Sequence, residues 1–272
     1  MAFAALVLVS SVALTGCAPE PVDEHIVIDG WIEDGGYPIV ILTSSLSVEE
    51  GAVWSQDNLR KHVLTTATVT VSDGENSVVL MGKKDDRYFP PYIYTTSWLK
   101  GEAGKTYSLH VKYGRTEATA VTTIPAPQPL LGITSVPEGD GYNVYCRFAA
   151  QPGSYYTFFS MRVGKDKTYL PSFLTQIDGS TVSGESNTLV MKGYDITSSE
   201  KHENLYAAED QVSIRFCTID RATYDFWKGY EESWLFSHNP FFPVTSGVPS
   251  NITGGYGLWA GYGATYATAP GL

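Results

Sequence analysis

The sequence has few of the residues that common catalytic and metal sites require. Its 272 residues include three cysteines and five histidines, and the histidines are scattered, with no HExxH motif. It also lacks the Gly-x-Ser-x-Gly turn that marks many serine hydrolases. We therefore expect no metal, no cofactor and no catalytic residue, and we predict that the protein is not an enzyme.

Basic residues are scarce relative to acidic ones. The chain has 18 Lys and Arg against 29 Asp and Glu, a formal net charge of −11. A chain with this charge is repelled by the phosphates of nucleic acids and by anionic lipid headgroups. The composition argues against nucleic-acid binding, and attachment to a membrane would have to come from a covalent lipid.

Long hydrophobic runs are also scarce. Residues 2–14 form an apolar stretch that is too short to span a bilayer but typical of a signal-peptide core. The stretch leads into Leu14-Thr15-Gly16-Cys17, which resembles the lipobox of bacterial lipoproteins. The resemblance implies that a signal peptidase recognises Leu14, Thr15 and Gly16 and that Cys17 is lipidated. The alternative, a buried free cysteine, is weaker because nothing before Cys17 could pack with it.

The residues after the cysteine are a short acidic segment with two prolines. Residues 1–16 are the predicted signal peptide, and residues 17–24 are a predicted lipidated tether that carries Glu20, Asp23 and Glu24. Such a cluster resembles the acidic segment of lipoproteins exported to the outer face of the outer membrane in Bacteroidota. An ordinary solvated linker is an equally good interpretation of these residues.

The rest of the chain has the pattern of an all-β protein. Short runs rich in Val, Ile, Thr and Tyr alternate with Gly, Asp, Asn and Pro clusters, as in antiparallel sandwiches and barrels. Alternating prolines then interrupt the pattern, and we predict a linker over residues 125–131. Two β domains follow from this division: an immunoglobulin-like or transthyretin-like sandwich over 25–124, and a β-sandwich or barrel over 132–272.

One amphipathic helix is expected near the C-terminus, over residues 219–236. Its apolar positions recur at steps of three and four, and Asp220 is placed to cap its first turn. Arg221 and Asp225 fall four residues apart on the opposite face, as an ion pair would. We expect Trp227 and its neighbours to pack on the second sheet.

Three aromatic residues are candidate contacts for a ligand or partner. Phe241 and Phe242 lie in a loop between Pro240 and Pro243, where the backbone is held extended. Trp259 lies on a strand whose same face is otherwise glycine. The glycines favour close approach of another backbone, and stacking of a sugar on Trp259 is the weaker alternative. For the Phe241 loop, covering a sheet edge is an equally good interpretation.

The two remaining cysteines, Cys146 and Cys217, are expected to be free thiols, so we predict no disulfide. In its strand Cys146 shares a face with Val144 and Phe148, whereas Cys217 alternates with the apolar residues of its own strand. One thiol should therefore face the core and the other should point away from it.

Motifs along nearly the whole mature chain resemble an uncharacterised family of Bacteroidota outer-membrane lipoproteins. The similar segments are residues 25–32, 38–43, 104–107, 224–227, 239–241, 249–252 and 254–262. The resemblance implies a β-rich accessory protein of a TonB-dependent outer-membrane receptor, anchored by its lipid on the extracellular face, that binds the cargo or the receptor. No catalytic motif accompanies it.

Two other functions stay open from the sequence. One is an envelope enzyme that acts on carbohydrate, and the other is a structural or adhesive surface protein. Neither has a motif of its own in this sequence.

Overall fold

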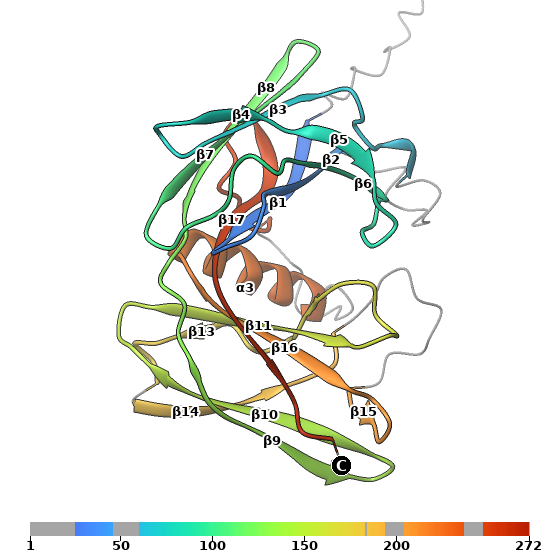
Figure 1. The fold of residues 1–272 in the computed structure, drawn as a ribbon, viewed down its shortest axis with the longest axis vertical. Coiled ribbons are helices and arrows are strands. Elements are labelled where there is room, and N and C mark those ends of the chain that lie inside the picture. The colour runs from blue at the N-terminus through green and yellow to red at the C-terminus, as the bar shows by residue number, and fades with distance from the viewer. Residues whose placement is uncertain (1–24, 46–59, 183, 194–203, 237–246, 272) are drawn as a thin grey trace, which may run out of the picture.

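A computed structural model describes residues 25–45, 60–182, 184–193, 204–236 and 247–271. The predicted signal peptide and tether, with Leu14, Thr15, Gly16 and Cys17, lie outside these residues, as do Phe241 and Phe242. Within the described part, strands dominate and one helix packs on them (Figure 1). The predicted all-β class, with layered sheets and a helix near the C-terminus, is confirmed.

The largest sheet has nine strands and runs through both the upper and the lower part of Figure 1. Eight strands follow one path and β13 (Ile177–Asp178) pairs with β11 off that path. In order the eight are β12 (Leu170–Pro171), β11 (Tyr155–Arg162), β16 (Val212–Ile219), β17 (Gly255–Thr268), β1 (Ile26–Glu33), β2 (Ile39–Ser44), β6 (Tyr92–Thr95) and β5 (Met81–Lys84).

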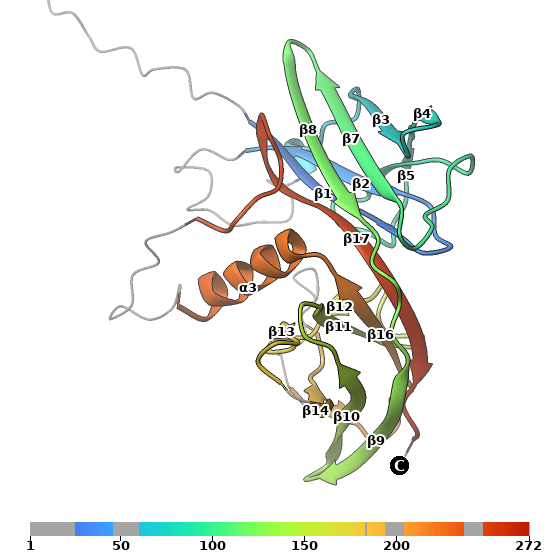
Figure 2. The ribbon, with the colours of Figure 1, turned by 90° about the vertical axis from the view of Figure 1, so that its left-hand side faces the viewer.

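Two four-stranded sheets pack on one face of the large sheet. The upper one contains β4 (Ser77–Val79), β3 (Thr68–Ser72), β7 (Thr106–Tyr113) and β8 (Thr116–Thr123). The lower one contains β14 (Gly184–Val190), β10 (Gly141–Ala150), β15 (Tyr206–Ala207) and β9 (Leu130–Glu138). Helix α3 (Arg221–Phe236) lies against the opposite face, to one side of β17 in Figure 2.

Strand β17 joins the two parts of the large sheet. Its first half, residues 255–262, pairs in parallel with β1, and its second half, residues 263–268, pairs antiparallel with β16. The glycines predicted on one face of this strand allow the backbone of neighbouring segments to lie close to it. A Cβ on Gly257 would lie 1.9 Å from the carbonyl oxygen of Ile28, and one on Gly263 would lie 2.2 Å from that of Pro125. Only glycine fits at these contacts.

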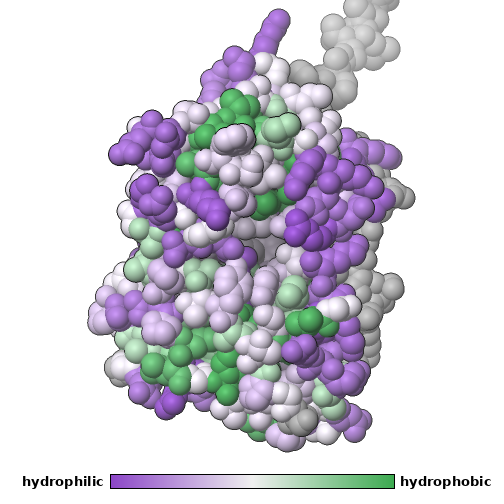
Figure 3. Space-filling model, viewed as in Figure 1, coloured by the Kyte–Doolittle hydropathy of each residue, from purple (hydrophilic) through white to green (hydrophobic). Residues whose placement is uncertain are grey.

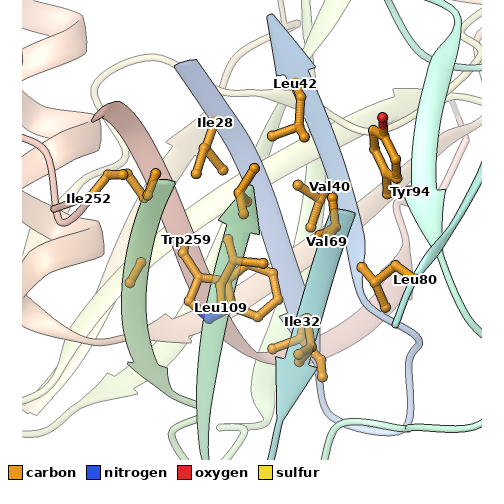
Figure 4. Packing of buried hydrophobic residues seen from close by; sticks show 14 of the residues in the cluster. Ile28, Ile32, Val40, Leu42, Val69, Leu80, Tyr94, Leu109, Ile252 and Trp259 are labelled. Atoms are coloured by element: carbon orange, nitrogen blue, oxygen red, sulfur yellow. The ribbon is translucent and has the colours of Figure 1, made fainter. Parts of the chain in front are cut away.

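The buried side chains form three clusters. The upper cluster lies between the large sheet and the upper small sheet, and Figure 4 shows Trp259 of β17 within it, near Leu109 and Ile28. A second cluster fills the space between the large sheet and the lower small sheet around Phe148 and Phe216. The third lies under α3, where Tyr224 meets residues of β16 and β17. Strand β17 therefore contributes to the first and third clusters, and Ala269, directly after it, contributes to the second.

The predicted linker runs beside β17 in both ribbon views (Figures 1 and 2). The carbonyl oxygen of Gln128 accepts a hydrogen bond of 2.8 Å from the hydroxyl of Thr265, and Pro125 lies against Gly263. Strand β9 begins at Leu130, inside the predicted linker. The division of the chain at 125–131 stays a prediction, and the structure adds that β17, expected in the second domain, also completes the first.

The start of helix α3 follows the sequence prediction. The backbone N–H of Thr223 donates to Asp220 Oδ1 at 2.8 Å, as in an N-cap, and Arg221 Nε lies 2.8 Å from Asp225 Oδ1. Trp227 is half-buried and donates its indole N–H to the hydroxyl of Tyr262 at 3.1 Å. The helix therefore binds the large sheet through a polar contact as well as through apolar packing.

Several strands differ from the prediction. The sequence pattern predicts one strand over 77–81, but these residues divide into β4 and β5, which join different sheets, and the backbone N–H of Leu80 between them donates to the carbonyl oxygen of Val69. Strand β9 was not predicted, and neither were the two-residue strands. Among the described strands, β9 pairs only with β10, so Pro137 loses no ladder hydrogen bond on its outer edge.

The outer surface is chemically mixed. Figure 3 shows hydrophilic side chains bordering smaller hydrophobic areas in both the upper and the lower part. The most exposed large hydrophobic residues are Trp98 and Met81, with 85% and 76% of their surface exposed. None of the described helical residues forms a segment long and apolar enough to cross a bilayer.

Candidate functional site

Trp259, a predicted ligand contact, is enclosed in the upper cluster. Its indole N–H donates to the carbonyl oxygen of Tyr107 at 3.0 Å, and its side chain has no exposed surface. The side-chain amide of Asn251 bonds its backbone N–H and C=O at 2.9 and 2.8 Å. A ligand cannot stack on this ring, so the prediction of Trp259 as a contact is wrong. The ring instead fills the upper cluster, against Gly30 of β1, its partner in the strand register.

The two cysteines occupy different clusters, as their strand parity predicted. Cys146 lies in the second cluster and Cys217 in the third, and both are free thiols. The third cluster was not expected, because Cys217 was placed on a face away from the core. Burial raises the pKa of Cys146 to about 12 and that of Cys217 to about 11. Both therefore stay protonated at neutral pH and are poor nucleophiles.

The structure reveals a charged site that the sequence did not predict, centred on Arg215 of β16. In the strand register Arg215 lies opposite Phe159 of β11 and Tyr266 of β17, so the three residues form one row across the sheet. Its guanidinium carbon lies 4.2 Å from the ring centre of Phe159 and 4.8 Å from that of Tyr262. Aromatic faces attract a desolvated cation, and Arg215 is only 8% exposed.

The counter-charge comes from the N-terminal part of the sheet. Glu33, at the end of β1, has Oε2 3.8 Å from Arg215 Nη1, which is an ion pair too long to be a hydrogen bond. The hydroxyl of Tyr266 lies 2.8 Å from both carboxylate oxygens of Glu33 and donates to them. Burial raises the pKa of Tyr266, so this hydroxyl keeps its proton. Tyr266 therefore holds the carboxylate that would otherwise move closer to Arg215.

The guanidinium of Arg215 is left incompletely bonded. Its Nε is buried and has no hydrogen-bond partner among the residues that the structure describes. A buried donor without an acceptor costs free energy, on the order of 1–3 kcal/mol for a neutral group and more for a charged one. Such a group in a native protein is either a structural cost or part of a site that something else completes.

More aromatic residues surround this pair. Tyr169 lies 5.5 Å from the ring of Tyr266 and shares a 2.8 Å hydrogen bond with the hydroxyl of Ser213. Trp31, two residues before Glu33 on the same face of β1, lies 5.8 Å from the ring of Tyr88. We call Glu33, Arg215, Tyr266, Tyr169, Trp31 and Tyr88 the junction site. Its strand residues come from both parts of the large sheet, and Tyr88 and Tyr169 come from loops that adjoin it.

Asp29 adds a second carboxylate on the same face of β1. Its side chain is exposed at the surface, but protein atoms around the carboxylate reduce its hydration. This desolvation raises the pKa of Asp29 to about 6. Asp29 thus adds a negative charge at neutral pH to the face of β1 that carries Glu33, four residues before Glu33.

The sequence as a whole is similar to one known protein family. It matches the family described as a domain of unknown function (DUF4249) over residues 18–267. The chain belongs to this family. No curated protein matches it.

In this DUF4249 chain the junction site has the composition of a binding site. Arg215 can only donate hydrogen bonds and ionised Glu33 can only accept them, while the rings supply flat apolar surface. Among the residues that the structure describes, no three His, Cys, Asp or Glu side chains gather as metal ligands would. The junction site can therefore orient a polar ligand through paired donors and acceptors.

One signal could have located this DUF4249 site from the sequence. Arg215 stands in the run Val212–Ile219, which is apolar at most positions rather than at alternate ones. Such a run is typical of a strand covered on both faces, where an arginine needs partners. The alternation of Val212, Ile214 and Phe216 instead suggested that Arg215 faces solvent.

Proposed function

We propose that the protein is a lipid-anchored accessory protein of a TonB-dependent outer-membrane transporter of Bacteroidota and binds a ligand at the junction site. The observation that carries the binding role is Arg215, a nearly buried guanidinium with an unpaired Nε beside a carboxylate that Tyr266 holds. Partly unsatisfied polar groups among aromatic rings are what a ligand site offers before its ligand arrives.

The position of the N-terminus supports the anchoring role. The segment Leu14-Thr15-Gly16-Cys17 supplies the lipidation sequence, and several acyl chains on one cysteine suffice for stable anchoring. The described chain begins at His25, at the upper end of β1 in Figure 1, whereas Glu33 ends the same strand nearer the middle of the molecule. An anchor before His25 would leave the junction site and the lower sheets away from the membrane, on the extracellular face.

The anchor is tested by substitution of the cysteine. We expect Cys17→Ala to remove labelling by a fatty-acid analogue and to release the protein from outer membranes. The control, Cys146→Ala, should keep both the label and the membrane association. Acyl labelling that persists in Cys17→Ala would show that the lipid is attached elsewhere.

The partner is tested by affinity purification of the lipidated protein from solubilised outer membranes. The result expected is a TonB-dependent transporter that co-purifies with the wild-type protein in near-stoichiometric amount. Recovery of the protein without any transporter would contradict the accessory role. In that case, a ligand bound at the junction site would have to serve a role other than uptake through a transporter.

A further inference from the structure

The junction site presents a donor-only group beside an acceptor-only group. Arg215 Nη1 and Glu33 Oε2 are 3.8 Å apart, too far to satisfy each other fully. A ligand that forms hydrogen bonds with both groups must offer an oxygen acceptor to the guanidinium of Arg215 and an O–H or N–H donor to the carboxylate of Glu33. Neighbouring hydroxyl groups do both, because each hydroxyl is a donor and an acceptor.

The charges disfavour an anionic ligand. Glu33 already balances Arg215, and Asp29 lies four residues before Glu33 on the same face of β1. A ligand carboxylate or phosphate would be repelled by Glu33 at close range and by Asp29 at longer range, in a chain with a net charge of −11. A carboxylate would also leave Glu33 without a donor from the ligand.

The aromatic residues add a requirement of shape. Tyr266 is 48% exposed, and its ring lies 5.5 Å from that of Tyr169. On the β1 side, Trp31 and Tyr88 are half-buried with their rings 5.8 Å apart. Flat rings beside hydrogen-bonding groups suit a ligand that has an apolar face and polar edges. The rings of saccharides have this character, with C–H groups on their faces and hydroxyls at their rims.

We infer that the junction site binds a neutral saccharide, with Arg215 donating to its oxygens, Glu33 accepting from a hydroxyl and Tyr266 stacking on the ring. This inference rests on the proposed ligand-binding role of the site and names the class of ligand. Tyr266 has a second task, since its hydroxyl keeps Glu33 from closing onto Arg215.

The test is calorimetric titration of the protein without residues 1–17, so that no lipid is attached at Cys17. The probes are the neutral disaccharides maltose, cellobiose, lactose and mannobiose, with glucuronate and acetate as anionic probes. We expect at least one neutral disaccharide to bind and neither anion to bind. Binding of the anions in place of the disaccharides would overturn the inference, and so would the absence of binding by every disaccharide to folded protein.

Two variants assign the binding to this site. Glu33→Gln should weaken the affinity for the disaccharide about tenfold, because a hydrogen bond to a charged acceptor is lost. Tyr266→Phe keeps the ring but releases Glu33 toward Arg215, so we expect a loss of about threefold to tenfold. Both side chains reach the surface, and thermal melting will check that the variants are folded. The control is Glu185→Gln, which removes an exposed pair with Arg147 in the lower sheet.

The outcomes separate this inference from the proposed function. If Glu33→Gln and Tyr266→Phe bind the disaccharide as tightly as the Glu185→Gln control does, the junction site is a structural clamp and the inference is wrong. If a transporter co-purifies but no disaccharide binds, the accessory role is supported and the inference of a saccharide ligand is wrong. If a disaccharide binds at Glu33 but no transporter co-purifies, the saccharide inference is supported and the accessory role is contradicted.

Discussion

The indole Nε1 of Trp259 donates a hydrogen bond to the carbonyl oxygen of Tyr107, 152 residues earlier in the chain, at 3.0 Å. Both groups are buried in the upper cluster, where the donor and the acceptor would otherwise lack partners. The last strand is therefore held in the N-terminal part of the molecule by a specific bond as well as by apolar packing. The stability of the upper part should depend on residues near the C-terminus.

Substitution of Trp259 tests this dependence. Trp259→Ala removes a large ring from a closed core, and we expect the free energy of unfolding to fall by about 3–5 kcal/mol. Trp259→Phe keeps most of the ring but leaves the carbonyl of Tyr107 without its donor, for a loss of about 1–3 kcal/mol. Urea denaturation followed by circular dichroism measures both. A free energy of unfolding for Trp259→Phe close to that of wild type would mean that the hydrogen bond contributes little.

Fragments test whether the upper part folds without β17. Residues 25–131 alone lack Ile252 and Trp259 of the upper cluster and the strand that pairs with β1. We expect this fragment to be unfolded or poorly cooperative in urea. Fusion of residues 249–269 to it through a flexible linker should restore a cooperative transition. A stable fragment 25–131 would show that the predicted N-terminal domain is independent.

Gly263 tests the packing of the linker on β17. An added methyl group would lie 2.2 Å from the carbonyl oxygen of Pro125, so the backbone of one segment must shift. We expect Gly263→Ala to lower the free energy of unfolding by about 1–3 kcal/mol and to make the peptide bonds near Pro125 more sensitive to protease. The matched control is Gly271→Ala, where an added methyl group meets nothing within 4 Å. It should be close to wild type in both measurements.

Trp227 tests the attachment of α3 to the sheet. Its ring meets Phe159 edge-on at 5.7 Å and its N–H reaches Tyr262. Because the side chain is half-buried, we expect Trp227→Ala to cost about 2 kcal/mol, less than a fully buried ring would. Trp227→Phe should recover the packing but not the hydrogen bond. Thermal denaturation will measure both variants, and a wild-type melting temperature for Trp227→Ala would contradict the docking of the helix through this residue.

Asp29 should make stability depend on pH. Its pKa is about 6 in the folded protein against 3.8 for a free side chain, so between these values the folded state holds a proton that the unfolded state has lost. The free energy of unfolding therefore falls as the pH rises from about 4 to above 6. Asp29→Asn should be more stable than wild type at pH 8, by about 1 kcal/mol because the carboxylate still contacts water, and equal to it near pH 3.5.

The control for this pH dependence is Asp140→Asn, in the exposed turn between β9 and β10. Urea denaturation of each variant between pH 3.5 and 8 gives the comparison. A difference between Asp29→Asn and wild type that does not change with pH would show that Asp29 acts through packing rather than through its charge.

Local chemistry in the sequence predicted the local structure well. The alternation of apolar residues located most strands, Asp220 predicted the start of α3, and the glycines of residues 255–263 predicted close backbone approach. Each of these signals depends on neighbours in the sequence. The pairing of β1 with β17 has no such signal, because its partners stand at opposite ends of the chain. Alternation within a strand says which face is buried but not by what.

The junction site was missed for the same reason. Glu33 and Tyr266 are separated by 233 residues, and nothing near either residue indicates the other. Alternation with Val212, Ile214 and Phe216 places Arg215 on the other face of its strand, which a two-layer sandwich would leave exposed. Helix α3 covers part of that face, so the strand is buried on both sides. The predicted contacts at Phe241 and Phe242 lie outside the described residues and remain predictions.

The place of β17 in the chain has a consequence for biogenesis. Domains usually begin to fold while the chain is still being made, starting from the N-terminus. Here the upper cluster cannot be completed until the last residues emerge, because β1 waits for a partner strand and for the ring of Trp259. Contacts between such distant residues also form slowly. Under the proposed lipid anchoring the chain would cross the inner membrane unfolded, and this order would help because β17 is synthesised after the other strands.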